Sequence, residues 1–270
     1  MPFLFPVILS VSFSPLSPTS IILLILISLI GGIGITAIGP GGILVTIALF
    51  AFTDLSPAEI AGTAIVTHIG TGIVGSLAFV RSGQLREPRT RRLALILSLT
   101  AIICTPLGVI INSRVSSAQF GIMLAIFVSV VGCSVLFREV RNRTAIDGEW
   151  EGAHGIVAQS ILGGGVSVLS GIFGIGGPMI AVPIMVIAGY PLLSALAAAQ
   201  VQSVFVASSG TFSYLAHGSI SWPLVLITGI PEMIGVWFGW KIAHAVPTRP
   251  LKYLLATTLI ALGPVLLLNH

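Results

Sequence analysis

Charged side chains are scarce in this sequence. Asp, Glu, Lys and Arg make up 7% of its 270 residues, whereas soluble domains carry about 25%. Hydrophobic residues make up 55%, and the mean hydropathy is +1.10. So little charge cannot cover so much apolar surface in water, and the apolar residues form long runs instead of the short alternating segments of a β-barrel. The composition therefore predicts an all-α, polytopic protein of the cytoplasmic membrane.

Cysteines and enzyme motifs are equally sparse. Cys104 and Cys133 lie in different apolar runs without CxxC spacing, so we expect two free, buried, small apolar side chains instead of a disulfide or a metal pair. The sequence has no HExxH, GxSxG or P-loop motif, which argues against an intramembrane enzyme and against an ATP-driven pump. We expect no catalytic residue, no cofactor and no metal site.

Most of the basic residues lie in short loops. Ten of the twelve are arginines, and the net charge of +4 is read as a signal of membrane orientation, not of a nucleic-acid partner. Cytoplasmic loops of membrane proteins carry an excess of Lys and Arg, so three loops are expected to be cytoplasmic. Their basic residues are Arg81, Arg86, Arg89, Arg91 and Arg92 in the first loop, Arg138, Arg141 and Arg143 in the second, and Lys241, Arg249 and Lys252 in the third.

Ten apolar segments are candidate membrane spans. Segments 40–53 and 176–189 are short and follow Gly-rich breaks, so each either crosses the membrane or dips in and returns. Counting ten spans places both termini outside. The Pro- and Ser-rich residues 1–20 lack a positive n-region, so we expect an irregular or interfacial lead-in, not a cleaved signal peptide. The spans are 19–38, 40–53, 57–80, 91–112, 117–138, 154–172, 176–189, 192–216, 221–244 and 250–268.

The two Gly-rich breaks mark an internal repeat. "GPGG" at 39–42 and "GIGG" at 174–177 are 135 residues apart, and glycines coincide again on this offset at Gly75 and Gly210. Each half holds five spans, and an odd number inverts the second half, as in many secondary transporters. The predicted units are a first transmembrane repeat over 19–138, a cytoplasmic linker over 139–153, and a second, inverted repeat over 154–268.

The paired breaks resemble those of the TauE/SafE family of membrane transporters. The resemblance rests on "GPGGILVTIALFAFTDLSP" and "GIGGPMIAVPIMVIAGYP", with "GSLAFVRSGQL" and "GTFSYLAHGSI" after them, and it covers residues 25–268. It implies export, or in some members uptake, of small organosulfur and organic anions such as sulfite, sulfoacetate or other sulfonates. The two breaks differ, because Pro40 corresponds to Ile175 and Pro178 corresponds to Ile43, so they need not share one geometry.

The breaks are also the main candidate substrate site. A broken helix leaves backbone groups unpaired, so it must line a cavity or be buried in protein. A helix that restarts there points free N–H groups and a positive dipole end at the cavity, which suits an anion. The alternative is close helix packing through small residues. The candidate residues are Gly39, Gly41, Gly42, Gly174, Gly176, Gly177 and Pro178.

Polar residues within the spans that follow the breaks extend this candidate site. They are Thr67 and His68 in the first half, and Gln200, Gln202 and Ser203 in the second. Neutral amides and hydroxyls can bind an anion that must later leave, although they could equally serve only as hydrogen bonds between helices. Gln200 and Gln202 lie about 200° apart around a helix, so we expect only one of them to face the site.

Two ionisable residues lie near the middle of predicted spans. His68 lies halfway along 57–80, and Glu232 follows Pro231 halfway along 221–244. Intramembrane ionisable residues are candidates for function by default, and either residue could carry a proton in a proton-coupled transporter. Purely structural roles remain the alternative for both.

The sequence thus favours a secondary transporter that moves small anions across the membrane by alternating access, with export as the expected direction. The alternatives are a passive anion channel and a membrane subunit of a larger complex. The expected partners are a small anionic substrate and the lipid bilayer. The sequence leaves the oligomeric state open, a homodimer included.

The predicted topology has a direct test. Reporter tags at the two termini should both be accessible from outside the cell, because an even number of crossings returns the chain to the side from which it started. A tag that is accessible only from the cytoplasm at the C-terminus would contradict the ten-span arrangement.

Overall fold

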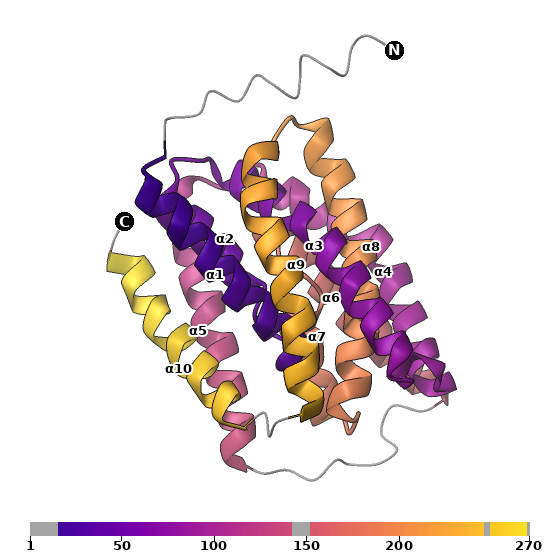
Figure 1. The fold of residues 1–270 in the computed structure, drawn as a ribbon. Helices are drawn as coiled ribbons and strands as arrows, with labels where there is room; N and C mark the ends of the chain where they lie inside the picture. Colours follow the sequence, from indigo (N-terminus) through magenta and orange to yellow (C-terminus); the bar gives the residue numbers. More distant parts are fainter. Residues whose placement is uncertain (1–15, 142–151, 246–248, 269–270) are drawn as a thin grey trace.

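The computed structural model describes residues 16–141, 152–245 and 249–268. Residues 1–15 of the expected lead-in and residues 142–151 of the predicted linker lie outside this part of the chain. The described residues form ten α-helices and the 3₁₀ turn η2, which confirms the all-α prediction (Figure 1). The helices are α1 (Pro18–Ala37), α2 (Ile43–Phe52), α3 (Pro57–Arg81), α4 (Pro88–Asn112), α5 (Ser117–Arg141), α6 (Gly152–Phe173), α7 (Pro178–Ile187), α8 (Leu192–Ala216), α9 (Trp222–Ala245) and α10 (Arg249–Leu268), with η2 at Gln84–Arg86.

Seven of the described helices, namely α1, α3, α4, α5, α6, α8 and α9, are long and apolar enough to cross a membrane. Helices α2 and α7 have ten residues each, or about 15 Å of helix. The hydrocarbon core of a bilayer is about 30 Å thick. Neither short helix can therefore cross the membrane alone.

Helices α1 and α2 form a hairpin that returns to the end of the molecule where it began. The last turn of α2 contacts the start of α5, where the ring centroids of Phe50 and Phe120 are 5.7 Å apart. At the same end, the Asn112 Nδ2 at the end of α4 donates to the Pro57 carbonyl at the start of α3. Figure 1 shows the start of α1 at this upper end as well. The short segment 40–53 thus dips in and returns.

Helices α6 and α7 form the corresponding hairpin from the opposite end. The Gln159 Nε2 in the second turn of α6 donates to the hydroxyl of Tyr190, which follows α7, at 2.8 Å. The Arg89 guanidinium at the start of α4 lies 4.8 Å from the Tyr190 ring centroid. Each hairpin returns the chain to the side from which it entered, as two full crossings would. The expected sides of all the loops are therefore the same as in the ten-span arrangement.

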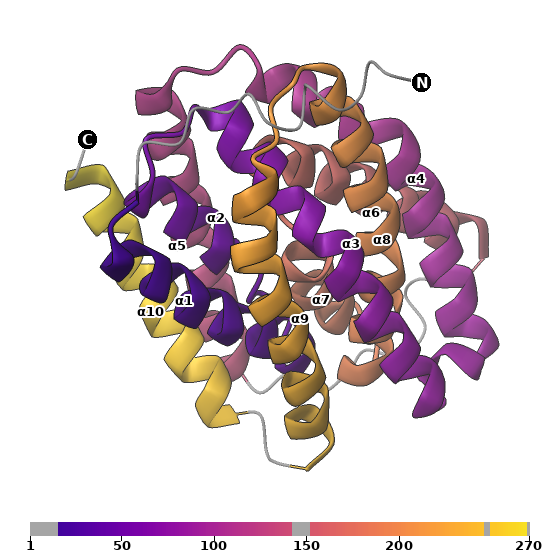
Figure 2. The same cartoon turned by 45° about the horizontal axis from the view of Figure 1, so that its top comes forward.

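The helices lie in a row of groups (Figures 1 and 2). Helices α5 and α10 form one edge, α3, α4 and α8 form the other, and α1 and α9 lie between them. The most extensive contacts join α1 with α9, α4 with α6, α5 with α10, and α3 with α8. Suppose each helix of the first half is exchanged with the helix five places later in the chain, α1 with α6, α2 with α7 and so on. The pair α1–α9 then becomes α6–α4, and the pairs α5–α10 and α3–α8 stay the same, so the set of pairs is unchanged. An inverted repeat requires that property, although the repeat itself stays a prediction.

Glycines with left-handed backbone conformations end the two long helices at the breaks. Gly39 has a φ of 112° and Gly174 a φ of 68°, a region that disfavours side chains. The Gly39 N–H donates to the Gly34 carbonyl at 2.9 Å, and the Gly174 N–H donates to the Ser170 carbonyl at 2.8 Å. Both breaks are thus glycine C-caps, despite the different positions of proline in the two sequences.

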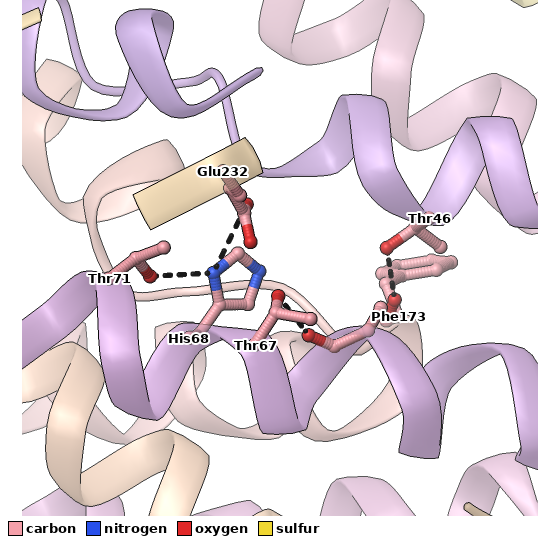
Figure 3. A network of polar contacts seen from close by, with 7 residues as sticks. Thr46, Thr67, His68, Thr71, Phe173 and Glu232 are labelled. Carbon is pink, nitrogen blue, oxygen red and sulfur yellow. Dashed lines mark hydrogen bonds and ion pairs between the residues drawn. The ribbon is translucent and has the colours of Figure 1, made fainter. Parts of the chain in front are cut away.

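Side chains from three other helices satisfy the last carbonyls of α6. The Tyr214 hydroxyl donates to Gly171 at 2.6 Å, and the Asn112 amide donates to Ile172 at 2.6 Å. The Thr46 hydroxyl, from α2, donates to Phe173 at 3.0 Å (Figure 3). The end of a helix leaves such carbonyls without intrahelical partners. Helices α2, α4 and α8 therefore hold the tip of the α6–α7 hairpin in place.

Both cysteines are free, but they are not buried as expected. Cys104 is half-buried and Cys133 is exposed on the protein surface. In a membrane protein that surface faces lipid, which is as apolar as a protein core. A small apolar side chain therefore needs no internal position here.

Close glycine contacts between α1 and α9 generate a stability prediction. A Cβ atom on Gly32 would overlap the Glu232 backbone carbonyl and lie 2.9 Å from the Val236 nitrogen. Backbone atoms cannot yield as a flexible side chain can, so G32A should lower the free energy of unfolding by about 1–3 kcal/mol. The measurement is the thermal unfolding midpoint of the detergent-solubilised protein.

The matched control is G165A. Gly165 is also helical, and a Cβ there would meet nothing within 4 Å, so alanine should leave the midpoint unchanged or raise it slightly because of its better helix propensity. Equal midpoints for the two variants would contradict the close packing of α1 against α9.

Candidate functional site

The tips of the two hairpins meet inside the protein around a small cavity. A Cβ on Gly39 would lie 3.1 Å from the Pro178 carbonyl oxygen and 3.2 Å from the Val182 Cβ, so the two breaks are in contact. The space between the lining atoms is about 190 Å³, but its walls are too close together to admit a water molecule. No water-sized space is thus left between the tips in this conformation. It is lined by Ile35, Gly39, Gly42, His68, Gly176, Pro178, Met179 and Ser203.

The His68 ring lies between the two tips. A Cβ on Gly42 would lie 2.7 Å from His68 Cε1, and a Cβ on Gly176 would lie 3.4 Å from His68 Cγ. Glycine at position 42 therefore makes room for the imidazole, whereas glycine at position 176 makes room for Ser203 Oγ, which would lie 2.6 Å from an added Cβ. His68 is 1% exposed, and its Nε2 has no hydrogen-bond partner among the described residues. A buried, unpartnered ring nitrogen at a cavity wall is available to bind a ligand.

Glu232 lies on the other side of the imidazole. Its Oε1 is 3.7 Å from His68 Nδ1, and the Thr71 hydroxyl lies 3.4 Å from the same nitrogen (Figure 3). Glu232 is fully buried, and the Thr67 side chain is its other polar neighbour. The two ionisable residues predicted separately from the sequence thus form one buried pair, contributed by α3 and α9.

The short helices begin at this cavity. Gly42 and Gly177 are their N-caps, both with helical backbone angles. The N–H groups in the first turn of a helix have no intrahelical acceptor, and the dipole adds partial positive charge there. Helix α7 begins with Pro178, which has no N–H, whereas in the first turn of α2 the Leu44 and Val45 N–H groups donate to the Gly41 and Gly42 carbonyls at 3.1 and 3.3 Å. The two sides of the cavity are therefore chemically unequal.

The structure brings together about half of the predicted substrate-binding residues. Five of them line the cavity with His68, namely Gly39, Gly42, Gly176, Pro178 and Ser203. The other glycines of the breaks pack against neighbouring helices. Added Cβ atoms would meet α1 at Gly41, Ala61 of α3 at Gly174, and Gln202 of α8 at Gly177.

The remaining polar candidates lie outside the cavity wall. The Gln202 Nε2 donates to the Gly163 carbonyl at 3.4 Å, which joins α8 to α6. Gln200 faces α3, where a Cβ on Gly75 would lie 2.6 Å from its Oε1. The Thr67 hydroxyl donates to the Ala64 carbonyl of its own helix at 2.8 Å. Both polar atoms of the Gln200 side chain and the Gln202 Oε1 have no hydrogen-bond partner among the described residues, and a role for these residues in binding stays a prediction.

Two residues at the site could not be found from the sequence. Ile35 and Met179 line the cavity, but an apolar side chain in an apolar helix gives no signal in the sequence. Thr71 contacts His68, and its position four residues after Thr67 places it on the same polar helix face, as the sequence indicates.

The described residues contain no group of three or more His, Cys, Asp or Glu side chains that could hold a metal ion. His68 and Glu232 are a pair without a third member.

Comparisons with known proteins agree with this architecture. The family model described as "Sulfite exporter TauE/SafE" matches residues 23–266. The chain is 24% identical to the "Probable membrane transporter protein YunE" of Bacillus subtilis (strain 168) over 90% of this chain and 96% of that protein. It is 32% identical to the "Probable membrane transporter protein MJ0441" of Methanocaldococcus jannaschii over 37% of this chain and 41% of that protein. No solved structure matches at a significant level.

The family match covers both hairpins, the cavity between their tips and nearly all of the described helices. The chain is therefore a multi-pass membrane protein that belongs to the TauE/SafE sulfite exporter family.

Proposed function

We propose that this protein is a secondary transporter of small organosulfur or organic anions, such as sulfite, sulfoacetate and other sulfonates. The anion binds between the hairpin tips, and the expected direction is export across the cytoplasmic membrane. The observation that carries the proposal is the buried His68 Nε2 without a partner, at a cavity where two helices begin. Backbone N–H groups and one imidazole suit an anion that is bound and then released.

The closed cavity favours alternating access over a passive channel. A channel needs a continuous path, whereas the described residues leave no space for a water molecule between the two tips, and the two hairpins enter from opposite ends of the molecule. Loosening one hairpin would expose the site to one side and leave the other side sealed. In the other step of the cycle, the other hairpin would loosen instead. Such an exchange is expected if the two halves are inverted repeats, and the symmetric pairing of the helices supports this prediction.

The buried His68–Glu232 pair supports proton coupling. Both residues are inaccessible in the closed conformation, and both adjoin the site that would be exposed in turn to each side. We therefore propose that this pair carries the coupled proton. Its protonation would then change together with access to the anion site.

An anion screen in proteoliposomes tests the function. Sulfite, sulfoacetate, thiosulfate and short carboxylates are offered with and without a pH gradient. We expect saturable flux of at least one sulfur oxyanion and uphill accumulation when the gradient is present. Flux that runs strictly down the anion gradient under all conditions would indicate a channel, and no flux of any of these anions would refute the proposed substrate class.

The variant G42A tests the position of the site. Gly42 has a φ of −62° and a ψ of −23°, so alanine adds no backbone strain, but its methyl group would lie 2.7 Å from the His68 ring. We expect anion flux to fall at least tenfold while the variant still folds, as judged by gel filtration and the unfolding midpoint. G165A, which adds a methyl group into open space, serves as the control, and equal flux from both variants would contradict this placement.

A further inference from the structure

The charge of the site is set by one isolated pair. Helices α1, α2, α7 and α8 surround the cavity and contain no Asp, Glu, Lys, Arg or His within their bounds. On α3 the other charged residues, Glu59 and Arg81, are nine and thirteen positions from His68. On α9, Lys241 and His244 are nine and twelve positions from Glu232. Nine residues of helix extend about 13 Å, so no other ionisable group on these helices adjoins the pair.

The pair has three states of protonation. Without a titratable proton, neutral His68 and ionised Glu232 together carry a charge of −1. One proton makes the pair neutral, whether it resides on the imidazole or on the carboxyl group. A second proton makes it +1. Since the pair is almost fully buried, an uncompensated charge of either sign is costly there.

An arriving anion changes which of these states is favoured. A monoanion beside the singly protonated pair leaves a net charge of −1 inside the protein. A monoanion beside the doubly protonated pair leaves a net charge of zero. Binding of the anion therefore favours binding of one further proton, and by linkage the proton strengthens binding of the anion to the same extent.

From this charge count, and resting on the proposed function, we infer that each monoanion crosses together with one proton and that the transporter selects monoanions over dianions. Sulfite would then cross as hydrogensulfite, and sulfoacetate with its carboxyl group protonated. The loaded site holds two protons and one anion, and the empty site holds one proton, so both forms are electrically neutral when they reorient. The proton and the anion move in the same direction. Export of an anion that accumulates inside the cell then carries a proton outward with it.

Glu232 and His68 have different roles in this scheme. Only His68 can supply the positive charge that balances the anion. Glu232 keeps a protonated His68 neutral overall while the site is empty. If the pair were only a structural ion pair, neutralising either residue would remove the same contact and should affect transport equally. If the pair balances the charge of the anion, neutralising His68 and neutralising Glu232 should have different effects on transport.

The test uses the full chain in vesicles of phosphatidylethanolamine and phosphatidylglycerol, with methanesulfonate as the monoanion and sulfate as the dianion. A potassium gradient with valinomycin sets the membrane potential independently of the pH gradient. We expect steady-state accumulation of methanesulfonate to rise about tenfold per pH unit and to be unchanged by 100 mV. Sulfate accumulation should be negligible.

Transport of an uncompensated charge would instead change accumulation about 50-fold per 100 mV, and that result would overturn the inference while leaving anion transport established. Sulfate accumulation equal to that of methanesulfonate would also overturn it. An absence of flux with methanesulfonate, sulfite and sulfoacetate alike would refute the proposed function itself.

The variants E232Q and H68Q separate charge from structure. E232Q removes the group that neutralises protonated His68 in the empty site, so flux should fall. The residual flux should stay insensitive to potential, because His68 can still balance the anion. H68Q leaves a site that can reach only zero charge, so methanesulfonate flux should fall at least tenfold, or any residual flux should respond to potential. Potential-insensitive accumulation in H68Q at the wild-type rate, or loss of flux in both variants with unchanged unfolding midpoints, would contradict the inference.

Discussion

Unpaired backbone groups within the membrane are the constraint on which this structure depends. Two helices end inside the protein, and every N–H and C=O exposed by those ends needs a partner because lipid offers none. Glycine caps at Gly39 and Gly174 satisfy part of this need. Side chains from α2, α4 and α8 satisfy the last carbonyls of α6. The starts of α2 and α7 adjoin the cavity. The proposed anion site uses the N–H groups at these two helix starts that have no partner within the described part of the protein.

The same constraint accounts for the low charge of the site. A fixed arginine at the cavity would bind an anion tightly and would need a permanent counter-charge when the site is empty. Helix N-termini attract an anion without adding a net charge. The His68–Glu232 pair adds a charge that depends on protonation and can be removed. A site of this kind can bind on one side of the membrane and release on the other.

Much of this architecture could be predicted from the sequence, because hydrophobic length and glycine position are local signals. Every helix lies within three residues of a predicted segment. The return of α2 and α7 could not be predicted, because a ten-residue helix does not reveal its direction. The approach of His68 to Glu232 depends on the register of α3 against α9, which a single sequence does not encode locally. Gln200 illustrates the same limit, since its position gave no sign that it packs against Gly75 and away from the cavity.

The anion is proposed to bind between the two hairpin tips, beside His68. The most direct measurement is a crystal structure with bromomethanesulfonate, whose bromine can be located by its anomalous scattering. We expect a bromine peak at the cavity between Gly42, Gly176 and His68, with the sulfonate oxygens within hydrogen-bonding distance of His68 Nε2. A well-occupied peak elsewhere, with the tips still in contact and the cavity empty, would contradict it.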